Sequence, residues 1–208
     1  MSDFPVTRSM EAVTPRGVAA VESRRLARPS GWWGMVVFVA TEATLFGTMI
    51  GTYFYLRFQR PHWPPAGVPD PKVVVPLVLT GVLVLTSFVM QFAFVSARRA
   101  RVGWMRLALF VALIVQSGYL AMQIHLFLDD LHKFSPNASS YGSIYFTLVG
   151  AHHFHVVVGI LLNAWLLLRF ITGITNYRLI ALHATTFYWH FVNVLAICVT
   201  LTQISPSL

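Results

Sequence analysis

Residues 143–169, SIYFTLVGAHHFHVVVGILLNAWLLLR, form the apolar run that decides the fold class. A helix rises 1.5 Å per residue, so roughly 20 residues are needed to cross about 30 Å of hydrocarbon. The run is longer than that, it contains no acidic residue, and its only arginine, Arg169, stands at its end. The stretch therefore predicts a helix that spans a membrane.

Four other apolar runs are also long enough to span a membrane, at residues 32–56, 73–95, 104–128 and 179–203. Proline-rich and polar segments separate several of them: QRPHWPPAGVPDPK (59–72) disfavours helix, and DDLHKFSPNASS (129–140) is polar. The sequence predicts an all-α, polytopic membrane protein built as a bundle of five transmembrane helices over residues 32–208.

The composition agrees with a membrane protein, because 56% of the residues are hydrophobic, 11% are charged and the mean hydropathy is +0.66. A soluble domain carries about 25% charged residues. The net charge of +8 does not indicate nucleic-acid binding, because the basic residues stand at the ends of the apolar runs. The single cysteine, Cys198, excludes a disulfide and a CxxC metal site, and we expect it in the core or facing lipid.

The basic residues predict the orientation of the bundle. Of the 15 Lys and Arg residues, all but Arg57, Arg60, Lys72 and Lys133 fall on the side that holds the N-terminus. By the positive-inside rule the N-terminus is cytoplasmic and the C-terminus periplasmic. Residues 1–31 are expected to form a polar, basic cytoplasmic tail, and they contain no apolar stretch of the kind that a cleavable secretory signal has.

Glu42 is the only carboxylate inside an apolar run. It follows Trp33 by nine residues, or about 13 Å, which places it near the middle of the membrane. An ionised carboxylate is costly there, so we expect Glu42 to be mostly protonated and to have a polar partner. Nearby, Gly47 and Gly51 have the GxxxG spacing that allows another helix to approach closely.

Three histidines, His152, His153 and His155, lie within four positions of the apolar run at residues 143–169. In a helix His152 and His155 share a face, whereas His153 is rotated by about 100°. One hypothesis is a metal site that also uses His183 and His190, which are seven residues apart. The alternative is hydrogen bonding between helices and to Glu42, and spacing alone leaves both open.

Polar side chains also occur in the run at residues 104–128. Gln116 and Gln123 are seven residues apart and lie on nearly one face, with His125 close to the end of the run. We expect a polar stripe that faces the inside of the bundle.

Four blocks resemble subunit III of the haem-copper respiratory oxidases in its five-helix bacterial form. They are ATEATLFGTMIGTYFYLR (40–57), QSGYLAMQIHLFL (116–128), YGSIYFTLVGAHHFHVVVGILLN (141–163) and FYWHFVNVLAICVT (187–200). The resemblance covers nearly everything after residue 31. Its most specific parts are the block that holds the three histidines and the Tyr-Trp-His-Phe run.

The resemblance implies an accessory subunit of a multi-subunit complex that reduces oxygen to water and pumps protons. Such a chain carries no haem, copper or other metal of its own and has no catalytic residue. It packs against the catalytic subunit I beside subunit II, binds phospholipid, supports proton uptake and protects the active site during turnover. We therefore expect a multi-pass protein of the bacterial plasma (inner) membrane that does not bind nucleic acid.

The family pattern carries over onto particular residues. The resemblance assigns the buried polar, proton-linked positions to Glu42, His152, His155 and His190. Asn193 stands where the family often has aspartate, so any ionised partnership there is in doubt. Glu42 is expected to bond to His152 or His155, because both lie near mid-depth.

Other positions depart from the family pattern or concern lipid. His153 stands where the family usually has glycine, and His125 where an acidic residue is common. The two N-terminal helices of seven-helix relatives are absent, which leaves the lipid cleft differently enclosed. Arg57, Trp33 and His153 are the candidate lipid contacts.

Other functions remain open on the sequence alone. Relatives of this family serve cytochrome c oxidases, quinol oxidases and nitric oxide reductases, and cytochrome c oxidase is expected here. A haem-binding membrane cytochrome and a proton channel built around Glu42 are the alternatives outside the family.

Overall fold

The computed structural model describes residues 30–207 and contains five long helices. They are α2 (Ser30–Phe58), α3 (Val74–Arg98), α4 (Val102–Lys133), α5 (Ser140–Arg169) and α6 (Asn176–Ile204), with short 3-10 turns η1 (Phe170–Thr172) and η2 (Ser205–Ser207). All five are long and apolar enough to cross a membrane. The prediction of an all-α bundle with five spans is confirmed. The predicted tail falls outside the described residues except for its last two positions.

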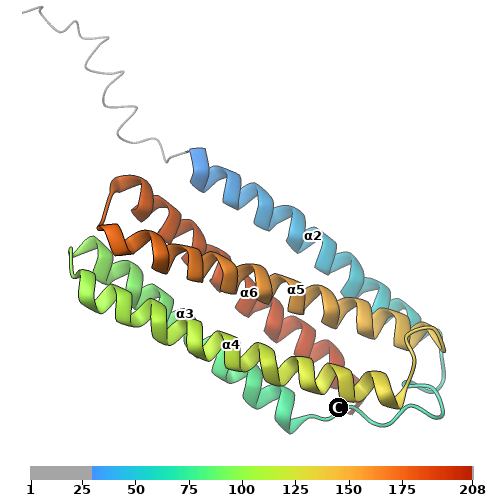
Figure 1. Cartoon of the computed structure of the whole chain (residues 1–208). Coiled ribbons are helices and arrows are strands. Elements are labelled where there is room, and N and C mark those ends of the chain that lie inside the picture. The colour runs from blue at the N-terminus through green and yellow to red at the C-terminus, as the bar shows by residue number, and fades with distance from the viewer. Residues whose placement is uncertain (1–29, 208) are drawn as a thin grey trace, which may run out of the picture.

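The helices are arranged around α6. Helix α6 packs against α2, α3 and α5, whereas α2 packs mainly on α5 and α6. In their most apolar windows, 56% of the α6 residues are buried but only 6% of the α2 residues. Figure 1 shows α2 on one side of the bundle and α3 and α4 on the other. Helix α6 is therefore the centre of the bundle and α2 its most peripheral helix.

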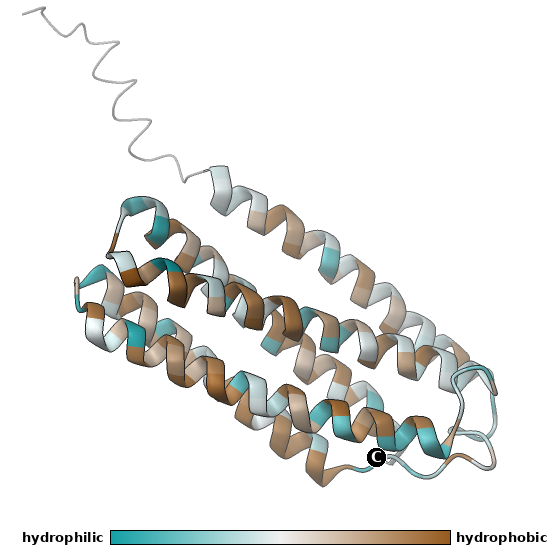
Figure 2. Ribbon diagram, in the orientation of Figure 1, coloured by the Kyte–Doolittle hydropathy of each residue, from teal (hydrophilic) through white to brown (hydrophobic). Residues whose placement is uncertain are grey.

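The connections lie at two ends of the bundle. The α3–α4 and α5–α6 connections share one end, and the α2–α3 and α4–α5 connections lie at the other end together with the C-terminus (Figure 1). We call this second end, which is predicted to face the periplasm, the outer end. Hydrophilic residues concentrate near the two ends, while apolar residues cover most of the helix surfaces between them (Figure 2).

Local sequence explains where two of the helices start. The side chain of Ser139 accepts a hydrogen bond from the backbone N–H of Gly142 and caps α5, and Thr175 caps α6 by accepting from the N–H of Arg178. Hydroxyl side chains at this position satisfy N–H groups that have no partner inside the helix. Gly173 follows η1 with φ of 105°, a conformation that residues with a side chain rarely adopt.

The buried core has two parts. The larger one fills the space between α3, α4, α5 and α6 and includes the fully buried indole of Trp189. The smaller one joins α2 to α5 and α6 and includes Phe46, Leu148 and Leu195. Phe46 lies one turn after Glu42, so this smaller core fixes the part of α2 that carries the partly buried carboxyl group.

Candidate functional site

Glu42 of α2 is hydrogen-bonded to His155 of α5. The distance from Glu42 Oε2 to His155 Nε2 is 3.0 Å, and the two side chains are 20% and 8% exposed. The predicted contact between Glu42 and a histidine of α5 is thus confirmed, and His155 is the partner. The bond links the peripheral helix α2 to the body of the bundle.

The second ring nitrogen of His155 determines how many protons the pair holds. His155 Nδ1 lies 2.7 Å from the carbonyl oxygen of Ala151. A carbonyl only accepts, so Nδ1 carries a hydrogen and donates it. The 3.0 Å contact then contains one proton, on either Glu42 Oε2 or His155 Nε2. Both forms have no net charge, which suits a site in hydrocarbon.

Apolar and aromatic groups hold the imidazole of His155 in place. The ring of Phe46 meets it edge-on, with centroids 5.2 Å apart. From α6, the hydroxyl of Tyr188 donates a hydrogen bond of 2.9 Å to the backbone carbonyl of His155. His155 is therefore held by contacts from both α2 and α6.

His152 belongs to a separate polar group. Its Nε2 lies 3.3 Å from the hydroxyl of Tyr119 on α4, and that hydroxyl accepts a bond of 3.1 Å from Gln123 Nε2. Its Nδ1 is buried and has no partner among residues 30–207. Thus His152 and His155 share a helical face, as predicted, but point to different neighbouring helices.

His153 is buried against α4. Only 8% of the residue is exposed, and its ring packs against the ring of Phe127, with centroids 5.5 Å apart. Within this chain its ring packs against α4, and its assignment as a lipid contact stays a prediction. His153 therefore faces α4, as His152 does, because α4 and α5 are packed side by side.

The two candidate residues of α6 do not contact Glu42. Asn193 is buried and its Nδ2 donates a hydrogen bond to the hydroxyl of Ser87 on α3. His190 is partly buried and has no hydrogen-bond partner within the described chain. These two positions therefore stay separate from the Glu42–His155 pair.

A further polar contact crosses between α4 and α5. Asn163 Nδ2 donates to Gln116 Oε1 over 3.0 Å and lies 3.3 Å from the carbonyl oxygen of Leu109, and both side chains are fully buried. Gln116 was expected to face the interior, but Asn163 was not singled out. A lone asparagine in an apolar run was the available signal for it.

Gly47 and Gly51 do not mediate contacts between the helices that the structure describes. Both are exposed, and a Cβ atom built on either would meet nothing within 4 Å. The expected close approach is therefore not made by the described helices. The GxxxG spacing places the two glycines on one face of α2, and the fold directs that face outward.

Two of the candidate lipid contacts lie at opposite ends of α2. Trp33 is 56% exposed and packs edge-on against Trp32. Arg57 donates a hydrogen bond of 3.0 Å to the carbonyl oxygen of Ser205 at the outer end. Trp33 is thus free to contact lipid, whereas one donor of Arg57 is used within the chain.

The histidines of α5 and α6 are not arranged as the ligand set that the metal-site hypothesis requires. Within residues 30–207, no group of three or more His, Cys, Asp or Glu side chains is placed to hold a metal ion. Both ring nitrogens of His155 are already engaged, one by Ala151 and one by Glu42. The arrangement suits hydrogen bonding and proton sharing.

Comparisons with known proteins agree with the resemblance of the four sequence blocks. A family described as Cytochrome c oxidase subunit III matches residues 25–203. The chain is 29% identical over 165 residues to the probable cytochrome c oxidase subunit 3 of Nocardia farcinica, which covers 77% of this chain and 80% of that protein. It is 27% identical over 179 residues to cytochrome c oxidase subunit 3 of Bacillus subtilis, covering 85% and 86%.

A relative named for another electron donor is equally similar. The chain is 30% identical over 178 residues to the cytochrome bo(3) ubiquinol oxidase subunit 3 of Pseudomonas aeruginosa, which covers 81% of this chain and 80% of that protein. Together with the five spans, these matches show that the chain belongs to the cytochrome c oxidase subunit III family, the third subunits of haem-copper oxidases.

Proposed function

We propose that this chain is the accessory subunit III of a proton-pumping cytochrome c oxidase in a bacterial plasma membrane. It packs against the catalytic subunit I beside subunit II, and the haem and copper centres belong to those partners. The reaction, the reduction of oxygen to water, occurs outside this chain. The relatives named cytochrome c oxidase subunit 3 support this choice of electron donor.

The observation that carries the role of this chain is the Glu42–His155 pair. It holds one proton without net charge at mid-depth, where either ion alone would be costly. The shared proton can move along the hydrogen bond without changing the net charge of the pair. Its position therefore responds to electric fields inside the complex. We propose that it supports proton uptake and that the neutral acid with the neutral imidazole is its main form, since separated charges are disfavoured in hydrocarbon.

Bound phospholipid is a further part of the proposal. Helix α2 exposes apolar side chains along its length, including Val37, Phe38 and Leu45, and it carries Trp33 at the end predicted to be cytoplasmic. Indole rings favour the boundary between headgroups and hydrocarbon. Arg57 at the other end supplies a charged group for a phosphate.

Replacing Glu42 with glutamine tests the proton-linked role. We expect the full complex to assemble at the wild-type level, since an amide keeps a hydrogen-bonding side chain at the position. The number of turnovers before inactivation, or the rate of proton uptake, should fall. Both are measured on purified oxidase reconstituted in liposomes.

Thr44→Val on the same helix is the matched control, because the Thr44 hydroxyl is exposed and bonds only to the carbonyl of Ala40 in its own helix. Unchanged turnover lifetime and proton uptake in Glu42→Gln would reject a proton-linked role. Loss of the assembled complex would instead make Glu42 a structural residue.

A quinol oxidase is the second candidate, because the chain is also similar to the ubiquinol oxidase subunit 3 of Pseudomonas aeruginosa. The subunits that co-purify with the tagged chain distinguish the two. A partner subunit with a dinuclear copper site that accepts electrons from cytochrome c is expected. A subunit II without copper, together with quinol oxidation, would replace cytochrome c oxidase by quinol oxidase.

A further inference from the structure

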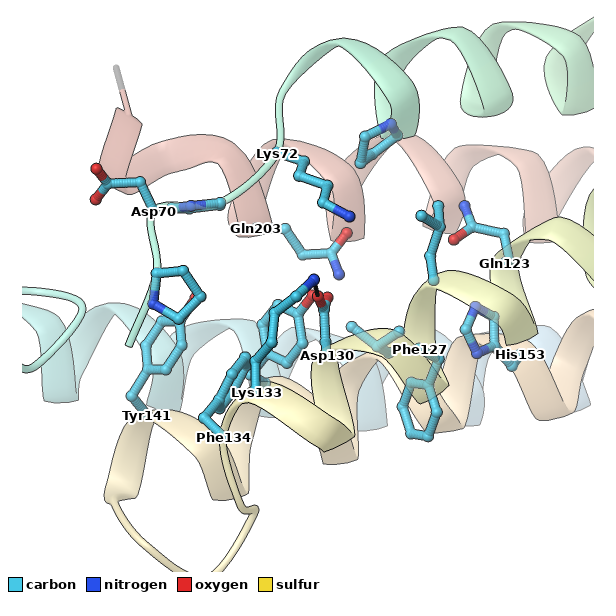
Figure 3. Close-up of a pocket in the computed structure, with 16 residues that line it drawn as sticks. Asp70, Lys72, Gln123, Phe127, Asp130, Lys133, Phe134, Tyr141, His153 and Gln203 are labelled. Atoms are coloured by element: carbon cyan, nitrogen blue, oxygen red, sulfur yellow. Dashed lines mark hydrogen bonds and ion pairs between the residues drawn. The ribbon is translucent and has the colours of Figure 1, made fainter. Parts of the chain in front are cut away.

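A cavity of about 220 Å³ opens at the outer end of the bundle. Its walls come from α4, α5, α6, the segment before α3 and the first turn of α3. Figure 3 shows Asp70 toward one end and Gln123 and His153 toward the other. Asp70 belongs to the exposed connection between α2 and α3, whereas His153 is buried. We call this space the outer cavity.

The outer cavity reaches far into the bundle. On α4 its lining extends from Lys133 back to Gln123, which corresponds to about 15 Å of helix axis. On α5 it extends from Tyr141 to His153, or about 18 Å. The hydrocarbon core is about 30 Å thick, so the inner end of the cavity approaches the middle of the membrane.

The inner end of the cavity is polar and lacks protein partners. Neither ring nitrogen of His153 is hydrogen-bonded to another residue in the described part of the chain, although 92% of the residue is covered. Gln123, which also lines the cavity, donates from its Nε2 to Tyr119, and its side-chain oxygen has no donor from residues 30–207. An imidazole and an amide oxygen in a dry apolar space would each cost free energy.

Polar groups continue from the inner end to the mouth. Tyr145 donates a hydrogen bond of 2.8 Å to Asp130, and Gln203 of α6 lies in the same wall. At the mouth Lys133 lies 3.6 Å from Asp130, so positive and negative groups are balanced. This pattern favours neither an anion nor a lipid tail, which would leave the polar wall unsatisfied.

We propose that the outer cavity is a binding site for a chain of water molecules that leads from the outer surface to His153 and Gln123. A space of about 15 Å³ of this kind accommodates one water, and a buried water needs two to four polar partners. The cavity exceeds that size several times over and provides partners along its length. Water at Gln123 is then one side chain away from the Tyr119–His152 contact.

The inference does not depend on the proposed role of the chain in an oxidase. It concerns the geometry of the cavity walls, and the Glu42–His155 pair is not part of the cavity lining. A failure of the water site would therefore leave the assignment of function intact, and the reverse also holds.

Cysteine accessibility tests the proposal in the assembled complex. The native Cys198, which is exposed, is first replaced by serine. His153→Cys is then compared with Phe154→Cys, its neighbour on α5, whose side chain is exposed on the outside of the bundle (65%). A small, charged, membrane-impermeant thiol reagent is added from the outer side of right-side-out vesicles.

A thiol reacts as the thiolate, which forms in water and not in hydrocarbon. We expect the reagent to label His153→Cys at least about ten times faster than Phe154→Cys, because only the first faces water. Equal rates, or labelling of His153→Cys only from the opposite side, would overturn the proposal. Slow labelling of both positions would show that lipid or protein fills the cavity and would overturn it as well.

A second pair of cysteine variants serves if the complex that carries His153→Cys does not assemble. Gln123→Cys lines the cavity from α4, whereas Ile124→Cys is turned to the outside, where the native side chain is 43% exposed. The same ratio of labelling rates is expected for this pair. A ratio near one would contradict the water site independently of His153.

Discussion

Replacing Gly159 with alanine is expected to destabilise the bundle by about 1–3 kcal/mol, the usual range for overpacking a core. A Cβ atom on Gly159 of α5 would lie 2.7 Å from Cζ2 of Trp189 on α6, far inside normal contact distance. Trp189 is fully buried, so its indole has no free space into which it can move. The two helices would have to separate, and α6 is the centre of the fold.

The measurement is the thermal stability of the purified protein in detergent, together with the yield of assembled complex. Gly150→Ala is the matched control on the same helix, because the nearest atom to its Cβ would be a ring carbon of Phe127 at 3.9 Å. Alanine forms helix better than glycine, so any loss at Gly159 reports the contact with Trp189. Equal stability of the two variants would contradict the close approach of α5 and α6.

Separating Glu42 from His155 has the second large expected effect. His155→Leu leaves the carboxyl group of Glu42 without its partner on α5, and Glu42→Leu does the same to His155 Nε2. Leaving a buried polar group unpaired costs about 1–3 kcal/mol. Each single variant should therefore lower the stability of the bundle by roughly that amount.

The double variant Glu42→Leu with His155→Leu should recover much of this loss, because replacing both partners by apolar groups is close to neutral. The coupling is measured as a double-mutant cycle of unfolding free energies. Additive losses, with the double variant the least stable of the three, would show that the two residues do not stabilise each other.

The five spans were predictable because hydropathy measures what a membrane requires of a helix. The ends of the helices were less predictable, because α4 continues to Lys133, past the predicted end of the span at residue 128. Asp129 and Asp130 are too polar for hydrocarbon, yet Lys133 forms i,i+4 and i,i+3 ion pairs with them inside the last turn. A helix can thus extend beyond the membrane where its side chains are polar.

The spacing of the three histidines predicted which of them share a face but not what that face meets. His155 meets Glu42, while His152, one turn away, meets Tyr119 on a different helix. His153, a candidate lipid contact on the sequence, packs its ring against Phe127 of α4. Neighbours across a bundle depend on how the helices are rotated and placed, which no local pattern encodes.

The same limit explains Gly47 and Gly51. A GxxxG pattern identifies a helix face that permits close approach, but it does not say whether the approaching helix belongs to the same chain. In this fold the face is turned outward. The contact of Asn163 was not predictable for a related reason, since its hydrogen-bond partner, Gln116, lies on another helix, α4.

The most direct test of the Glu42–His155 pair is infrared spectroscopy of the intact complex, comparing wild type with Glu42→Gln near neutral pH. The proposed neutral pair predicts a C=O stretching band of a protonated carboxylic acid that is absent from the variant and that shifts when His155 is replaced by leucine. If Glu42→Gln removes only carboxylate bands and leaves the carboxylic acid region unchanged, Glu42 is ionised and the proposed neutral form is wrong.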